Sequence, residues 1–228
     1  MSILQKLAHA LSPVLFKAGQ NIHTLLSKQG QWRSIREARP VRANGTPLPW
    51  YTYPAIEYLV RFDWSTARIF EYGAGFSSLF WANRAKLVIS VDRDAEWVRR
   101  LEPQAGSNLR LLFRAGRADY VGAIREPDTK FDLVVIDGHW RHDCVAPGME
   151  CLEKRGMVLL DNSDMFVWVA KRLRDEGLFQ IDFSGFGPVN NYAWTTSLFV
   201  RADVDIRRDA DPYPIAGLGV TVEPEDEA

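Results

Sequence analysis

The sequence predicts an α/β protein built on a doubly wound, mostly parallel sheet that ends in an antiparallel hairpin. Between residues 48 and 201, short β-rich runs alternate with helical patterns, which is typical of βαβ units. Two of the runs, 133–136 and 157–160, are almost entirely apolar, as expected for central strands buried on both faces. The last two runs are joined by a loop without helical periodicity, so we expect them to pair antiparallel at one edge of the sheet.

Residues 1–46 form the first expected unit, a helical and then basic extension. Its second half carries five basic residues against the single acid Glu37, and it ends at the turn signal Asn44-Gly45-Thr46-Pro47. Its first half has apolar residues at helical spacing. We expect a helix there that covers the domain or forms a contact in a homodimer. The apolar positions are Ile3, Leu4, Leu7, Leu11, Val14 and Leu15, and the basic residues are Lys28, Arg33, Arg36, Arg39 and Arg42.

Residues 47–202 form the expected α/β domain, and residues 203–228 an acidic tail. The expected strands are 67–72, 87–92, 109–114, 131–137, 156–161, 179–183 and 195–201. Helices are expected at 54–62 and 77–85, after a cap at Asp94, and over 164–176. Ser163 is the expected cap of the last helix and Gly177 its end.

Composition narrows the function classes before any motif is considered. The chain has 228 residues, 46% of them hydrophobic, which excludes a wholly disordered protein. Its 28 basic residues balance 29 acidic ones, which argues against a general nucleic-acid binder. No apolar run reaches the ~18–20 residues of a transmembrane helix, and no secretory signal is evident. With only Cys144 and Cys151 available for disulfides, we expect a cytoplasmic protein with reduced thiols.

A glycine-containing loop follows the first strand of the domain. Gly73-Ala74-Gly75 leads into a helix that begins near Ser77, so the backbone can approach a ligand closely. Asp92 ends the next strand, about 20 residues on, where an acid can bind the two hydroxyls of a ribose. The pattern indicates an adenosine-containing ligand, which is compatible with either NAD or S-adenosylmethionine.

The residues around this loop favour the sulfonium compound. Ser77 and Ser78 stand where the dinucleotide fingerprint has its third glycine. Glu71, directly before the loop, is a poor neighbour for a pyrophosphate, but it can hold the α-amino group of a methionine moiety. We therefore expect a cationic ligand at this position.

With Glu71, Gly73 and Gly75 as its first motif and Asp92 as its ribose acid, the domain resembles the class I S-adenosylmethionine-dependent methyltransferases. The resemblance implies their Rossmann-like, seven-stranded sheet with a final antiparallel hairpin. It also implies that the region after the third strand contacts adenine. Asp119 would accept a hydrogen bond from the adenine amino group, and Tyr120 would stack on the ring.

Strand-end acids predict a metal site on the same edge of the sheet. Asp137 ends the fourth expected strand, and Asp161-Asn162 end the fifth, so three oxygens would be available for Mg²⁺. This arrangement is similar to that of the metal-dependent, catechol-type O-methyltransferases. Their lysine base has no counterpart here, and His139 is the expected general base. Both a magnesium-assisted and a metal-independent transfer stay open, and Asp137 is also expected beside the methyl donor.

The resulting expectation is O-methylation of a small, hydroxyl-bearing acceptor, either a sugar or a phenol, without nucleic acid as a partner. Aromatic residues in loops would form the acceptor pocket. Two alternatives remain: a nicotinamide-dependent oxidoreductase, and a methyltransferase-like protein that binds without catalysis. The aromatic residues concerned are Trp50, Tyr51, Tyr53, Trp140, Tyr192 and Trp194.

Overall fold

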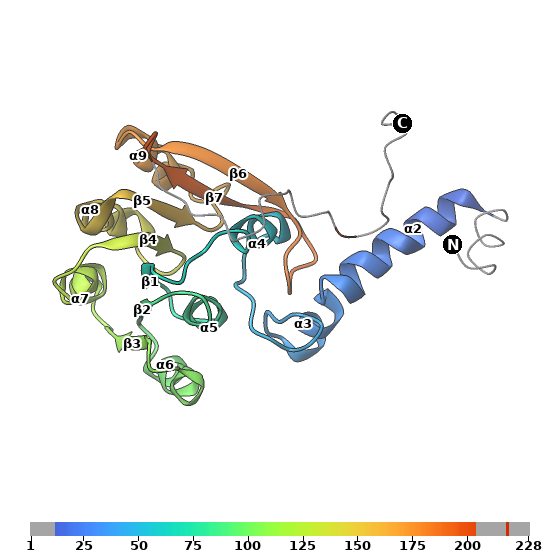
Figure 1. Ribbon diagram of the computed structural model, residues 1–228, viewed down its shortest axis with the longest axis horizontal. Helices are drawn as coiled ribbons and strands as arrows, with labels where there is room; N and C mark the ends of the chain where they lie inside the picture. The colour runs from blue at the N-terminus through green and yellow to red at the C-terminus, as the bar shows by residue number, and fades with distance from the viewer. Residues whose placement is uncertain (1–11, 204–217, 219–228) are drawn as a thin grey trace.

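The computed structural model describes residues 12–203 and residue 218, and a seven-stranded sheet lies at its centre (Figure 1). The strand order is β3-β2-β1-β4-β5-β7-β6, and neighbours from β3 to β5 pair in parallel. The mostly parallel, doubly wound sheet expected from the sequence is thus confirmed. The strands are β1 (Arg68–Tyr72), β2 (Leu87–Asp92), β3 (Leu109–Phe113), β4 (Phe131–Ile136), β5 (Leu152–Leu160), β6 (Phe179–Gly185) and β7 (Trp194–Val200).

The last two strands form the expected antiparallel hairpin at one edge of the sheet. Strand β7 pairs antiparallel with both β5 and β6, so β6 is the edge strand and runs parallel to β5. The antiparallel pair therefore lies at one edge of the sheet, as expected, with β7 as its inner strand. Burial explains the order, because almost every residue of β7 is buried whereas none of β6 is. The more apolar strand takes the inner position.

Helices cover both faces of the sheet. One buried cluster joins α4 and α5 to the first face, and the other joins α7, α8 and α9 to the second face. The helices are α2 (Pro13–His23), η1 (Thr24–Lys28), α3 (Gln31–Glu37), α4 (Tyr53–Leu59), α5 (Phe76–Ala82), α6 (Ala95–Leu101), η2 (Glu102–Gln104), α7 (Arg117–Gly122), η3 (Ala123–Arg125), α8 (Arg141–Cys151) and α9 (Val167–Asp175).

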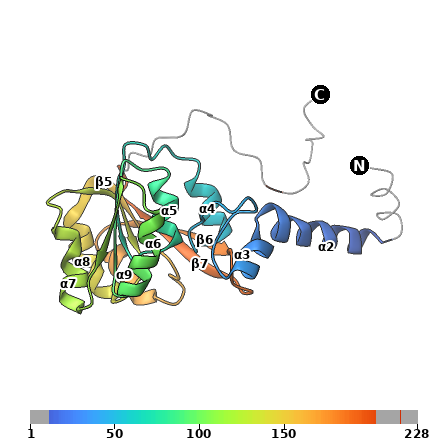
Figure 2. The ribbon, with the colours of Figure 1, turned by 90° about the horizontal axis from the view of Figure 1, so that it is seen from below.

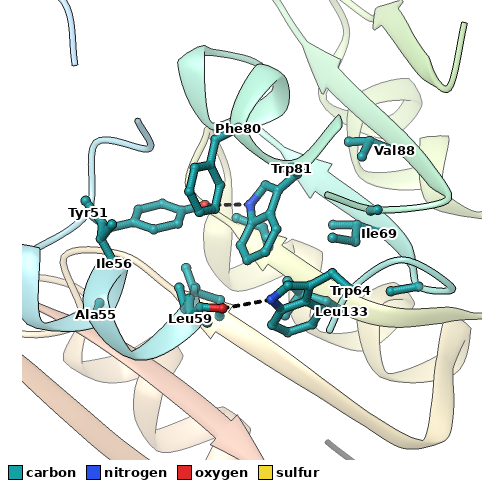
Figure 3. Packing of buried hydrophobic residues seen from close by; sticks show 14 of the residues in the cluster. Tyr51, Ala55, Ile56, Leu59, Trp64, Ile69, Phe80, Trp81, Val88 and Leu133 are labelled. Atoms are coloured by element: carbon teal, nitrogen blue, oxygen red, sulfur yellow. Dashed lines mark hydrogen bonds between the residues drawn. The ribbon is translucent and has the colours of Figure 1, made fainter. Parts of the chain in front are cut away.

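Aromatic rings anchor the segment before α4 to α5 (Figure 3). The hydroxyl of Tyr51 accepts a hydrogen bond from Trp81 Nε1 at 3.4 Å, and Trp64 Nε1 donates to the Leu59 carbonyl at 2.8 Å. Tyr51 is fully buried and Tyr53 is 4% exposed. Tyr51 belongs to the core, so the expectation that it lines an acceptor pocket was wrong. Tyr53 is nearly buried and lines a cavity beside α2 and α4. Through Trp81, Tyr51 helps to fix the position of α5, which begins directly after Gly75.

Two expected helix caps have different outcomes. Asp94 caps α6 as expected, and its carboxylate accepts from the amides of Glu96 at 2.8 Å and Trp97 at 3.0 Å. Ser163 does not cap α9, which begins only at Val167. Its hydroxyl is instead 2.6 Å from that of Ser197 in β7, so the buried strand is a better partner for it than the helix end.

The N-terminal extension has two parts with different surroundings. Helix α2 has no buried residue and projects away from the sheet (Figures 1 and 2). After it, Gln31 donates to the carbonyl of Gly187 at 2.9 Å, and an isolated bridge pairs Val41 with Pro47. Positions 3, 4, 7 and 11 of the expected helix, and the acidic tail apart from residues 203 and 218, lie outside the described residues. None of the helices described is long and apolar enough to cross a membrane.

Candidate functional site

A cavity of 240 Å³ lies beside the loops that follow β1, β2 and β4. These strands are parallel neighbours, so their carboxyl ends share one edge of the sheet, where ligands of such folds bind. Residues of the N-terminal extension form the remaining wall. The lining consists of Ala38, Arg39, Pro40, Trp50, Gly73, Ala74, Gly75, Phe76, Ser77, Asp92, Trp97, Asp137, Gly138 and His139.

The two loop glycines have different roles. Gly73 has φ +101°, and a Cβ there would lie 2.7 Å from the carbonyl oxygen of Asp137. Only glycine therefore allows the loop after β1 to touch the loop after β4. A Cβ on Gly75 would meet nothing closer than Ser77 Oγ at 3.6 Å. Space beside the Gly75 backbone is thus open, which fits a ligand that lies against it.

Asp92 links the glycine loop to the end of β2. Its Oδ2 accepts from the Ala74 amide at 3.1 Å and its Oδ1 from the Asp94 amide at 2.9 Å. Burial raises the pKa of Asp92 above its ordinary value, while these amides act in the opposite direction. A carboxylate oxygen can accept more than one hydrogen bond, and Asp92 lines the cavity. This geometry suits a carboxylate that accepts from ribose hydroxyls.

Glu71 lies beneath the loop rather than on the cavity wall. It is fully buried, and its Oε2 accepts from Ser90 Oγ at 2.7 Å and from Ser78 Oγ. Burial raises the pKa of Glu71 to about 7. Ser78 Oγ also accepts from the Gly75 amide at 3.0 Å. The position differs from the expected contact with a ligand's amino group: the carboxylate supports the loop from below.

Around the expected metal position, the structure places a guanidinium. Arg141, 9% exposed, donates from Nη2 to Asp137 Oδ1 at 2.9 Å and from Nε to the Gly138 carbonyl at 3.0 Å. Its Nη1 donates to the Asp161 carbonyl and to Asn162 Oδ1, the latter at 3.4 Å. The three expected ligand residues are therefore brought together, but around a side-chain cation.

The carboxylate of Asp161 points to β7 and not to the cavity. Its Oδ1 accepts from Trp194 Nε1 at 3.1 Å and from Thr196 Oγ1, and Asp161 is 3% exposed. Burial raises the pKa of this carboxyl well above its ordinary value. In the described part of the chain, no three His, Cys, Asp or Glu side chains are grouped for a metal. The residues present do not fit the expected Mg²⁺ site, because the Arg141 cation already bonds Asp137 Oδ1 and Asn162 Oδ1, and the Asp161 carboxylate is bonded to β7.

Of the remaining expected site residues, His139 lines the cavity, whereas Tyr120 and Asp119 do not. His139 is exposed and lines the cavity. Tyr120 is fully buried, its hydroxyl accepts from the His139 amide at 3.3 Å, and its ring packs edge-on against Trp140. It therefore has no free face for adenine. Asp119 is exposed and is not among the lining residues.

The structure adds a wall that sequence reasoning missed. Ala38, Arg39 and Pro40 from the extension line the cavity with Trp50, which is 41% exposed. Arg39 is oriented by Glu37, which accepts from its Nη2 at 2.6 Å, and its guanidinium lies 5.6 Å from the Phe76 ring centre. The run of arginines was visible in the sequence. No pattern in the neighbouring sequence predicted that Arg39 would line the cavity together with the glycine loop.

Solved structures share this architecture at low sequence identity. The O-methyltransferase TomG from Streptomyces achromogenes, in complex with S-adenosylmethionine, is 15% identical, with a TM-score of 0.56 over 79% of this chain and 94% of its own. Precorrin-6y C5,15-methyltransferase from Geobacter metallireducens is 13% identical, with a TM-score of 0.51 over 69% and 93%. No protein-family model and no curated protein matches the sequence. The chain has the Rossmann-like fold of these methyltransferases.

Proposed function

We propose that this protein is an S-adenosylmethionine-dependent methyltransferase that methylates an oxygen of a small, hydroxyl-bearing acceptor, a sugar or a phenol. The observation that carries the proposal is the cavity beside Gly73–Gly75, with the carboxylates of Asp92 and Asp137 in its wall. Two acids and an open backbone suit a cationic nucleoside better than a diphosphate. The shared fold supports methyl transfer at the level of architecture.

Each lining residue has a role in holding such a donor. Asp92 accepts from the ribose hydroxyls, and the open backbone at Gly75 lies against the amino-acid part. Asp137, 19% exposed and paired with Arg141, faces the positively charged end. When bound, the donor supplies an electrophilic methyl group on a sulfonium. The protein's contribution is to hold donor and acceptor in line.

On the acceptor side, His139 is the proposed general base. Its ring is exposed at the cavity, and a neutral imidazole can take the proton of an acceptor hydroxyl. Trp50 is 41% exposed and lines the same cavity, where its ring can pack against the face of a sugar or phenol. Asp119 and Tyr120 have no place in this proposal, since neither reaches the cavity.

Three further expectations stay proposals. The division into residues 1–46, 47–202 and 203–228 is one, although Arg39 and Pro40 show that the first unit contributes to the site of the second. A cytoplasmic location is another, and the free, buried thiols of Cys144 and Cys151 are compatible with it. The third is a homodimer through the N-terminal helix.

Calorimetry distinguishes the proposed methyltransferase from a nicotinamide-dependent oxidoreductase. We expect S-adenosylmethionine and S-adenosylhomocysteine to bind and NAD not to bind. Asp92→Ala should weaken binding of both by about 100-fold, which corresponds to about 2.7 kcal/mol. Asp94→Ser is the matched control, because it keeps the cap of α6 and lies outside the cavity lining. Binding of NAD alone would refute the proposal in favour of an oxidoreductase.

Methyl transfer is tested with a labelled donor and a panel of sugars, phenols and short RNAs. Transfer to a sugar or phenol, lost in His139→Ala and retained in His142→Ala, is the expected result. His142 is a suitable control because it is exposed and bonded to Arg172. Transfer only to RNA would refute the small-molecule acceptor. Donor binding without transfer to any compound would favour a non-catalytic binding protein.

A further inference from the structure

Arg141 occupies a position that helix stability does not explain. It is the first residue of α8, where the helix dipole presents its positive end. A cation there is unfavourable by about 0.3–1 kcal/mol at an exposed site. It is also nearly buried, so its charge needs compensation from the protein. The reason for an arginine at this position therefore lies in its contacts.

The hydrogen bonds of Arg141 all go to residues that directly follow two neighbouring strands, β4 and β5. Carbonyl and side-chain oxygens after β4 and β5 accept from Nε, Nη1 and Nη2, and the ring of Phe166 lies 4.2 Å from the guanidinium carbon. Asp137 is the acceptor that also lines the cavity. Its carboxylate thus accepts a hydrogen bond from Nη2 of a guanidinium that its other bonds hold in place, and Asp137 also lines the cavity.

The same oxygens cannot serve a divalent cation at the same time. Mg²⁺ needs oxygen ligands at 2.0–2.1 Å in an octahedral arrangement. The guanidinium already uses Asp137 Oδ1 and Asn162 Oδ1, and its positive charge would repel a metal placed beside it. Displacing the guanidinium from these oxygens would leave a nearly buried charge without its carboxylate partner, which is strongly unfavourable.

We propose that Arg141 is the resident cation of this site: its guanidinium takes the place of a divalent metal and holds the Asp137 carboxylate toward the cavity. The oxygens after β4 and β5 therefore do not form a site for a divalent metal. Arg141 is a positioning residue, because it acts on the ligand through Asp137. The proposal has two parts. The first, that Arg141 excludes a metal, is independent of the proposed function. The second, that Arg141 positions Asp137 for the ligand, rests on the proposed function.

Metal binding tests the first part without any reaction. Titration of the wild-type protein with Mn²⁺, followed by electron paramagnetic resonance of the free ion, should show no stoichiometric site up to millimolar concentration. The Asp137→Asn variant should give the same titration curve. A one-to-one Mn²⁺ site in the wild type that is lost in Asp137→Asn would overturn the proposal.

Donor binding tests the second part. Arg141→Met should weaken S-adenosylmethionine binding at least tenfold, and Arg141→Lys should recover part of that loss by restoring a charge. Arg125→Met is the matched control, since Arg125 also pairs with an acid of α8, Glu150, at 2.6 Å but lies on the surface. Circular dichroism shows which variants are folded, and Arg141→Lys keeps the test open if Arg141→Met does not fold.

The outcomes are distinguishable. Unchanged binding by a folded Arg141→Met, or an Arg141→Lys that binds less tightly than Arg141→Met, would overturn the positioning role. A wild-type protein that binds neither S-adenosylmethionine nor S-adenosylhomocysteine would overturn the proposed function and the positioning role with it. The Mn²⁺ titration would then still decide whether Arg141 excludes a metal.

Discussion

Glu71 near the end of β1 and Asp137 just after β4 are two carboxylates on neighbouring parallel strands with different surroundings. Glu71 is fully buried and accepts hydrogen bonds from serine hydroxyls, whereas Asp137 is paired with a guanidinium at 2.9 Å and lines the cavity. Burial raises the pKa of Glu71 to about 7 and that of Asp137 to about 6, the latter against the effect of Arg141. The comparison teaches that the partner of a strand-end acid, more than its position, decides whether it offers a charge to a ligand.

The largest effect should come from breaking the Asp137 pair. Asp137→Ala leaves Arg141 nearly buried without its carboxylate, so the free energy of unfolding should fall by about 3–5 kcal/mol. Removing both partners in Asp137→Ala/Arg141→Met should be less destabilising than the sum of the single changes. Urea unfolding of the four proteins measures this coupling. If the two single changes in the free energy of unfolding add up to that of the double variant, the Asp137–Arg141 pair contributes no coupling energy.

Glu71 should instead make the free energy of unfolding depend on pH. Its folded pKa of about 7 lies above the ordinary 4.5, so the folded state keeps a proton that the unfolded chain has released. The contribution of Glu71 to the free energy of unfolding should therefore be greatest below pH 4.5 and should fall by about 3 kcal/mol as the pH rises through 7. Denaturant unfolding of wild type and Glu71→Gln between pH 4.5 and 8 measures the slopes. The variant should lose this fall; equal slopes would contradict the assignment.

The two loop glycines sharpen the comparison, since only Gly73 touches the Asp137 loop. Gly73→Ala should lower the free energy of unfolding by about 2 kcal/mol, because φ +101° is strained for alanine and Cβ would meet the Asp137 carbonyl at 2.7 Å. Gly75→Ala should change stability by at most about 0.5 kcal/mol while weakening donor binding. Thermal unfolding and calorimetry separate the two. Equal loss of stability in both variants would count against the assigned roles.

The smallest effect on folding is expected in α2, far from both acids. Val14 and Leu15 are 76% and 73% exposed, so Leu15→Lys should alter the free energy of unfolding by at most about 0.5 kcal/mol. If the expected homodimer forms through this helix, the same change should convert dimer to monomer in light scattering. Ala18→Lys, also exposed, controls for the added charge. A wild-type monomer would remove the dimer hypothesis.

Much of the fold could be predicted because its signals are local. Alternating strands and helices, continuous apolar runs and the Asp94 cap are properties of a few adjacent residues, and the structure confirms them. Gly73, Gly75 and Asp92 were placed at one edge because parallel strands end together, and they do line one cavity. Their roles toward a donor remain predictions.

Other features depended on contacts between distant segments. The inner position of β7 reflects which strand buries more, and Tyr51 became a core residue because Trp81 lies beside it. The same holds for Arg39, which reaches the cavity only because the extension folds back over the glycine loop. No residue pattern along the chain carries such information.

The sequence by itself determined the order of the strands along the chain, the glycine loop, and the carboxylates at the strand ends. Tertiary structure alone decided what those carboxylates face: serine hydroxyls for Glu71, β7 for Asp161 and a guanidinium for Asp137. The physical reason is that spacing fixes where a side chain emerges, whereas its charge state and availability depend on the burial and the partners that packing brings to it.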